Sequence, residues 1–126
     1  MSDQSRERLE ENIRQALPHL PGENAWDLAN VLHRLIAALQ PEQIYVFGSQ
    51  ARGEATSNSD VDLLLIVSHS DLPGHQRDQM AYHAAGPHLD ALDLLVLTRE
   101  EFERRRSVVA SLPATVVREG RTLYAA

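Results

Sequence analysis

Two chemically versatile residue types are missing from this sequence. Its 126 residues include no cysteine, which excludes disulfides, thiolate zinc sites and cysteine nucleophiles, and we therefore expect a cytoplasmic location. All twelve basic residues are arginine. Because lysine is absent, phosphate-binding loops of the Walker A type and Schiff-base chemistry are excluded as well.

Long apolar runs are missing too. No run approaches the roughly 20 residues that a membrane helix needs, and the N-terminal segment MSDQSRERLEEN lacks the apolar stretch of a secretory signal. We therefore expect no membrane partner. The net charge of −6 disfavours a nucleic-acid partner, because proteins that grip a nucleic-acid backbone usually carry a basic face.

The first forty residues show helical periodicity. Apolar residues recur at spacings of three and four before Pro18 and the Pro21-Gly22 pair, which predicts an amphipathic helix within residues 1–22. A second helix is expected to begin near Asn24, as its N-cap, and to end before Pro41. We interpret both helices as packing on a sheet, with a partner-binding role for the first helix as the alternative.

The remainder of the chain alternates between extended and helical patterns. Three strands are predicted, at residues 44–47, 61–67 and 92–97, and the last two are apolar on both faces, as in strands covered on both sides. Further predictions are a crossover helix around residues 76–85, a last helix that begins near Thr98 with Glu101 in a capping box, and a short helix end, Gly turn and small strand at residues 116–124. We therefore expect an α/β (α+β) fold, a small mixed sheet flanked by helices.

The chemistry concentrates in the segment GSQARGEATSNSDVD, residues 48–62. Asp60 and Asp62 are two residues apart at the start of a predicted strand, so both carboxylates would lie on one face, about 6.5 Å apart along the chain. Such a pair can hold two magnesium ions, which prefer oxygen ligands. A lone Asp-x-Asp is weak as a signal, but burying two like charges beside an apolar strand is costly unless cations or hydrogen bonds compensate.

A third carboxylate is expected from Asp93, at the head of the next buried strand. If the two strands are neighbours in register, Asp60, Asp62 and Asp93 converge at one end of the sheet. Asp90 is the competing candidate, but it precedes the apolar run, and we interpret it as a turn residue.

Gly48 and Ser49 follow the first predicted strand and suit a phosphate. A strand that runs into a glycine and a small hydroxyl residue at a helix N-terminus presents free backbone N–H groups to an anion, although Gly-Ser is also a common turn. Arg52 has two interpretations that the sequence leaves open: a phosphate contact, or a surface pair with Glu54.

Gly48-Ser49, ten further residues and Asp60-Val61-Asp62 match the GSX10DXD signature of the polymerase-β-like nucleotidyltransferases, and the string GSQARGEATSNSDVDLLLIV resembles their minimal, MNT-type branch. The resemblance covers roughly residues 25–124. It implies a polymerase-β-like fold for residues 23–126, with residues 1–22 as an N-terminal helical extension.

The resemblance also implies roles for single residues. Asp60, Asp62 and Asp93 would hold two Mg²⁺ ions, Asp93 would help to deprotonate the acceptor hydroxyl, and Gly48 and Ser49 would contact the β and γ phosphates of the nucleotide. The expected reaction transfers AMP from ATP, with pyrophosphate as the leaving group. MNT-type proteins often act as antitoxins that add AMP to a tyrosine of a helical HEPN-type partner, which we take as the leading interpretation. The alternatives are aminoglycoside-type small-molecule nucleotidylation and a non-catalytic nucleotide-binding or partner-binding module.

Overall fold

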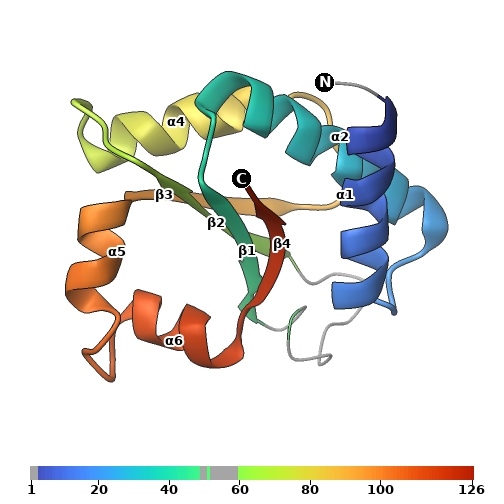
Figure 1. Cartoon of the computed structure of the whole chain (residues 1–126). Coiled ribbons are helices and arrows are strands. Elements are labelled where there is room, and N and C mark those ends of the chain that lie inside the picture. Colours follow the sequence, from blue (N-terminus) through green and yellow to red (C-terminus); the bar gives the residue numbers. More distant parts are fainter. Residues whose placement is uncertain (1–2, 49–50, 52–59) are drawn as a thin grey trace.

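The computed structural model describes residues 3–48, 51 and 60–126 of the chain (Figure 1). The helices assigned in these residues are α1 (Asp3–Ala16), α2 (Gly22–Leu39), α4 (Gly74–Ala85), α5 (Arg99–Arg105) and α6 (Leu112–Glu119). The strands are β1 (Gln43–Phe47), β2 (Val61–Val67), β3 (Leu92–Thr98) and β4 (Arg121–Ala125). No helix in the described part of the chain is long and apolar enough to cross a membrane.

The strands form one mixed sheet in the order β3-β2-β1-β4. β1 pairs antiparallel with both β2 and β4, whereas β2 and β3 are parallel and joined through α4. Such a parallel pair requires a crossover connection, which the helix supplies. The expected α/β class with a small mixed sheet is confirmed.

Helices cover both faces of the sheet (Figure 1). Alternate residues of β2 enter two separate cores: Leu63 and Leu65 pack with α1, α2 and α4, while Leu64 and Ile66 pack with α5 and α6. Because β2 is a central strand covered on both sides, it is apolar at nearly every position after Asp62, as its sequence predicted.

Helix α1 belongs to the larger of these two cores. Leu9 and Ile13 of this helix, and Leu17 directly after it, are fully buried there. Asn12 Nδ2 donates a 2.9 Å hydrogen bond to the carbonyl oxygen of Leu123 in β4. The packing interpretation of this helix therefore holds in the described structure. A domain division at residue 22 and a partner-binding role of α1 both stay predictions.

The start of α2 differs from the prediction. The helix begins at Gly22, and its first hydrogen bond runs from Ala25 N–H to the carbonyl oxygen of Pro21 at 3.0 Å. Pro21 is the N-cap because its φ of −58° suits a residue that enters a helix and its missing N–H is not needed there. Asn24 therefore lies inside the first turn, and its side chain donates instead to Asp90 Oδ1 at 2.9 Å.

The capping box at the start of α5 is confirmed. Glu101 N–H donates to Thr98 Oγ1 at 3.2 Å, and Thr98 N–H donates to Glu101 Oε1 at 2.8 Å. The helical region that follows is divided in two, because Ser111 starts a second helix: its Oγ accepts from Ala114 N–H at 3.2 Å and donates to the carbonyl oxygen of Arg105.

Candidate active site

Two aspartates lie side by side at one end of the sheet. Asp62 in β2 is the register partner of Asp93 in β3. Neighbouring strands are about 4.8 Å apart, so these two side chains start close together, on the same face of the sheet as Leu64 and Leu95. The convergence predicted from the sequence depends on neighbouring strands in register, and β2 and β3 are such neighbours. Asp60 directly precedes β2 and is exposed.

Gly48 lies against the carboxylate of Asp62. Phe47, the last residue of β1, pairs with Asp62, and Gly48 follows it with a φ of +74°, a conformation that residues with side chains rarely adopt. A Cβ at this position would collide with Asp62 Oδ2 and would lie 3.2 Å from Asp62 Cγ. The local geometry therefore requires glycine for two independent reasons.

Asp93 is contacted by Tyr82, which the sequence analysis missed. Tyr82 in α4 donates from its hydroxyl to Asp93 Oδ1 at 3.1 Å and accepts from Leu94 N–H at 2.9 Å. Partial burial raises the pKa of Tyr82, the Leu94 N–H lowers it, and the hydrogen bond to Asp93 raises it again. One feature of the sequence could have indicated this contact: Tyr82 lies on the predicted crossover helix between the two strands that carry the aspartates.

The loop that leads into β3 is held by α2. Arg34 donates through Nε to the carbonyl oxygen of Ala85 and through Nη2 to that of Pro87, both at 2.7 Å. Asp27 Oδ2 accepts from Leu89 N–H at 2.8 Å. Asp90 lies before β3 and accepts a hydrogen bond from Asn24 of the same helix. The residue of β3 that pairs with Asp62 is therefore Asp93 and not Asp90.

The carboxylate oxygens at this end of the sheet are suitable ligands for a divalent cation. Carboxylate oxygens are the ligands that magnesium prefers, and glycine at position 48 leaves the space beside Asp62 open to its carboxylate. In the described residues no three His, Cys, Asp or Glu side chains are gathered as a metal site. The ligand roles of Asp60, Asp62 and Asp93 stay predictions, and Ser49 and Arg52 lie outside the described residues.

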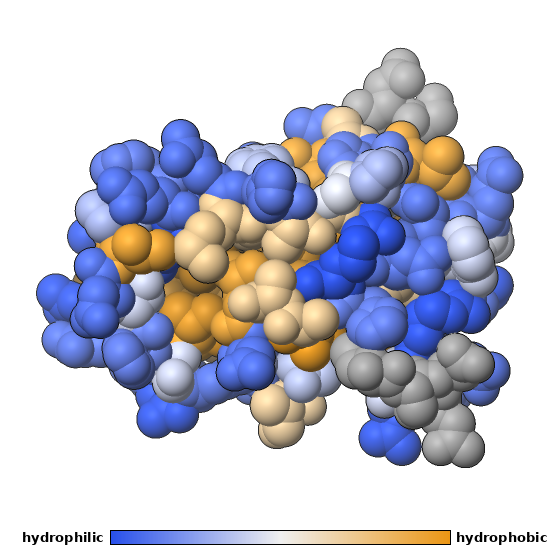
Figure 2. Space-filling model, turned by 90° about the horizontal axis from the view of Figure 1, so that it is seen from above, coloured by the Kyte–Doolittle hydropathy of each residue, from blue (hydrophilic) through white to orange (hydrophobic). Residues whose placement is uncertain are grey.

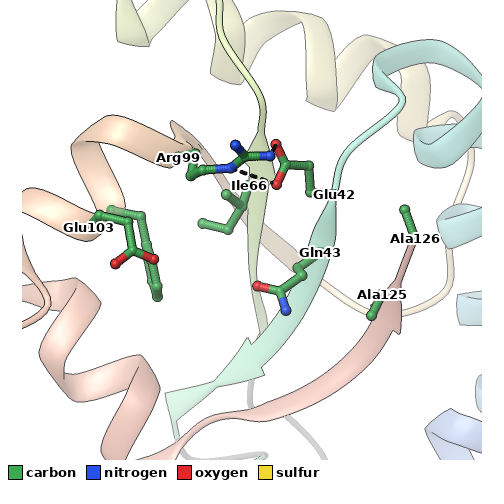
Figure 3. Close-up of a pocket in the computed structure, with 8 residues that line it drawn as sticks. Glu42, Gln43, Ile66, Arg99, Glu103, Ala125 and Ala126 are labelled. Carbon is green, nitrogen blue, oxygen red and sulfur yellow. Dashed lines mark hydrogen bonds and ion pairs between the residues drawn. The ribbon is translucent and has the colours of Figure 1, made fainter.

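Two hollows lie away from these aspartates. One, of about 470 Å³, is at the opposite end of the sheet, where Gln43 pairs with Ile66; there Arg99 Nε donates to Glu42 Oε2 at 2.9 Å (Figure 3). The other, of about 570 Å³, lies between α2 and α4, on the side where Figure 2 shows apolar surface. Its apolar lining consists of Ala38, Leu39, Leu72, Met80 and Ala84.

Comparisons with known proteins point to one family. The model of the nucleotidyltransferase domain family matches residues 28–124. A candidate nucleotidyltransferase from Sulfolobus solfataricus has a similar structure, with a TM-score of 0.57 and 20% identity over 94% of this chain and 87% of that chain. A chain of a toxin-antitoxin crystal structure with AMP-PNP aligns with a TM-score of 0.47 and 24% identity over 77% of this chain and 73% of that one. No curated protein matches the sequence. The Sulfolobus structure supports the fold alone, and the toxin-antitoxin chain aligns too weakly to support any function.

Proposed function

Because this chain belongs to the nucleotidyltransferase domain family, we propose that it transfers a nucleoside monophosphate, AMP from ATP, to an acceptor hydroxyl with the help of divalent metal ions. The observation that carries the proposal is the pairing of Asp62 with Asp93, with Gly48 packed against the Asp62 carboxylate. Two acids from adjacent strands and a close backbone approach are what a site for a metal-bound triphosphate needs.

Each residue of the site has a role in this proposal. Asp60, Asp62 and Asp93 would hold two Mg²⁺ ions, which neutralise phosphate charge when they are bound. Gly48, with Ser49 and Arg52 beyond it, would lie along the phosphates. Asp93 would accept the proton of the acceptor hydroxyl, whose oxygen bonds to the α phosphorus while the bond from that phosphorus to pyrophosphate breaks. The protein itself supplies no covalent nucleophile, so positioning and charge neutralisation account for the catalysis.

The acceptor that we propose is a tyrosine of a HEPN-type partner, with this chain as its antitoxin. This part rests on the resemblance of residues 48–67 to the minimal branch of the superfamily. In the test, the chain is incubated with ATP, magnesium and a candidate HEPN-type partner protein, and that partner is then analysed by intact-mass and peptide mass spectrometry. We expect the added mass of AMP on a tyrosine, absent when the chain carries Asp62→Asn. Efficient transfer to an aminoglycoside by the isolated chain, with none to the partner, would contradict the proposed acceptor.

A further inference from the structure

Tyr82 reaches from α4 to the edge of β3 and holds one oxygen of Asp93. Its hydroxyl accepts from Leu94 N–H at 2.9 Å and lies 3.1 Å from Asp93 Oδ1. Asp93 is a carboxylate and offers no proton of its own when it is ionised, so the single proton of the hydroxyl points to it. The backbone contact fixes where the hydroxyl lies, and the hydroxyl in turn fixes Asp93 Oδ1.

We propose that Tyr82 is a positioning residue that orients the Asp93 carboxylate for the metal-bound nucleotide. The inference rests on the proposed function, in which Asp93 is a ligand. Asp93 is exposed, and an exposed aspartate without a partner samples several side-chain rotamers. The hydrogen bond from Tyr82 to Oδ1 restricts this rotation, and Oδ2 is then the oxygen left to face the metal ion and the acceptor hydroxyl. Hydrogen-bond partners of this kind orient metal ligands in proteins, and their loss weakens metal sites.

A purely structural role for Tyr82 is the competing explanation. Helix α4 covers the edge of β3 with other side chains as well: Asp78 Oδ1 accepts from Val96 N–H at 2.9 Å, and Arg77 Nη1 donates to the carbonyl oxygen of Val96 at 3.3 Å. Asp78 therefore makes the same kind of edge contact as Tyr82 but has no contact with Asp93 among the hydrogen bonds of the described residues. Asp78→Ala is the control, because it removes a contact of α4 with the edge of β3 but no hydrogen bond to Asp93.

The experiment is calorimetric titration of ATP, with Mg²⁺ and with EDTA, into the wild-type chain and the variants Tyr82→Phe, Asp93→Asn, Asp78→Ala and the double variant of Tyr82 and Asp93. Tyr82→Phe should weaken ATP binding about tenfold in magnesium and little in EDTA. In the Asp93→Asn background it should have almost no further effect, since the two residues act as one unit. Asp78→Ala should lower the thermal midpoint about as much as Tyr82→Phe does, without the loss of affinity.

The outcomes separate this inference from the proposed function. Magnesium-dependent binding that Asp93→Asn weakens and Tyr82→Phe leaves unchanged would overturn the positioning role alone. An equal loss of affinity in Asp78→Ala and Tyr82→Phe would assign the effect to the strand edge, and additive losses from Tyr82 and Asp93 would also contradict the inference. A wild-type chain that binds ATP equally in magnesium and in EDTA would overturn the proposed function and this inference together.

Discussion

Replacing Gly48 by alanine tests the geometry of the site most sharply. Alanine at a positive φ of +74° lowers the free energy of unfolding by about 1 kcal/mol or more relative to glycine. The new Cβ would also collide with Asp62 Oδ2. Because that oxygen is at the end of a side chain that can rotate, relief of the collision adds about 1 kcal/mol of rotamer strain. Gly48→Ala should therefore destabilise the fold by about 2 kcal/mol, which lowers Tm by roughly 8 °C in a domain of this size.

The two contributions can be separated by removing the Asp62 carboxylate. In an Asp62→Ala background the nearest remaining atom of residue 62 is Cβ, at 3.6 Å from the added methyl group, which is an ordinary contact. Gly48→Ala should then cost only the backbone strain of about 1 kcal/mol. The expected coupling energy between the two positions is therefore about 1 kcal/mol, larger than the usual deviation from additivity. Urea unfolding of the four proteins measures it.

In the proposed function Asp62 holds a cation, so the same substitution should weaken nucleotide binding by displacing its carboxylate. We expect at least about a tenfold loss of magnesium-dependent ATP affinity, the size seen when the support of a metal ligand is removed. Gly86→Ala is the control, since Gly86 has a comparable φ of +65° but its Cβ would meet Arg34 Nε instead of Asp62. It should lose stability and keep its ATP affinity. A stability loss from Gly48→Ala that is equal with and without the Asp62 carboxylate would refute the reasoning.

Two further predictions concern single acids. Asp93→Asn should abolish transfer while Tm stays near that of the wild type. Asp90→Asn should keep most of the activity, because the oxygen of the new amide can still accept the hydrogen bond from Asn24. Transfer rates and Tm of both variants are measured, and an active Asp93→Asn would contradict the role of Asp93. The hydrogen bonds from Arg77 hold the pKa of Glu101 at about 2, below its ordinary 4.5, so the ion pair stabilises the fold above pH 4.5 and this stability is lost as the pH falls towards 2. Glu101→Gln should cost about 1 kcal/mol or more at pH 7, because Glu101 is partly open to solvent but the buried Arg77 loses its counter-charge. It should also flatten the fall of Tm with acid, and an unchanged acid profile would contradict this.

The strands and the capping box were predictable because local sequence determines them. A central strand is apolar where both faces are covered, which marks residues 61–67 after Asp62 without knowledge of their neighbours. The Thr98–Glu101 box depends on residues three positions apart. The start of α2 was predicted wrongly, because both Pro21 and Asn24 are residues that can precede the first turn of a helix. In the structure Pro21 is the N-cap, and the side chain of Asn24 donates a hydrogen bond to the distant Asp90.

Contacts between distant segments could be predicted only in part. The prediction that Asp62 and Asp93 converge held only if their strands were neighbours in register. A helix between two buried strands indicates such a parallel pair, because parallel strands need a crossover connection. The contact of Tyr82 with Asp93 depends on the rotation of α4 about its own axis, and the contact of Gly48 with Asp62 depends on the antiparallel pairing of β1 with β2. Neither leaves a periodic pattern in the sequence, so both required the three-dimensional structure.

The proposed function depends on a metal-dependent nucleotide site at the sheet end formed by Gly48, Asp62 and Asp93. Calorimetric titration of ATP into the chain, once in magnesium and once in EDTA, tests it most directly. We predict that magnesium tightens ATP binding at least about tenfold and that Asp62→Asn removes this gain, because the substitution removes the charge that we propose to hold the cation. Equal ATP affinity in magnesium and in EDTA, or a magnesium effect that survives Asp62→Asn, would contradict the claim.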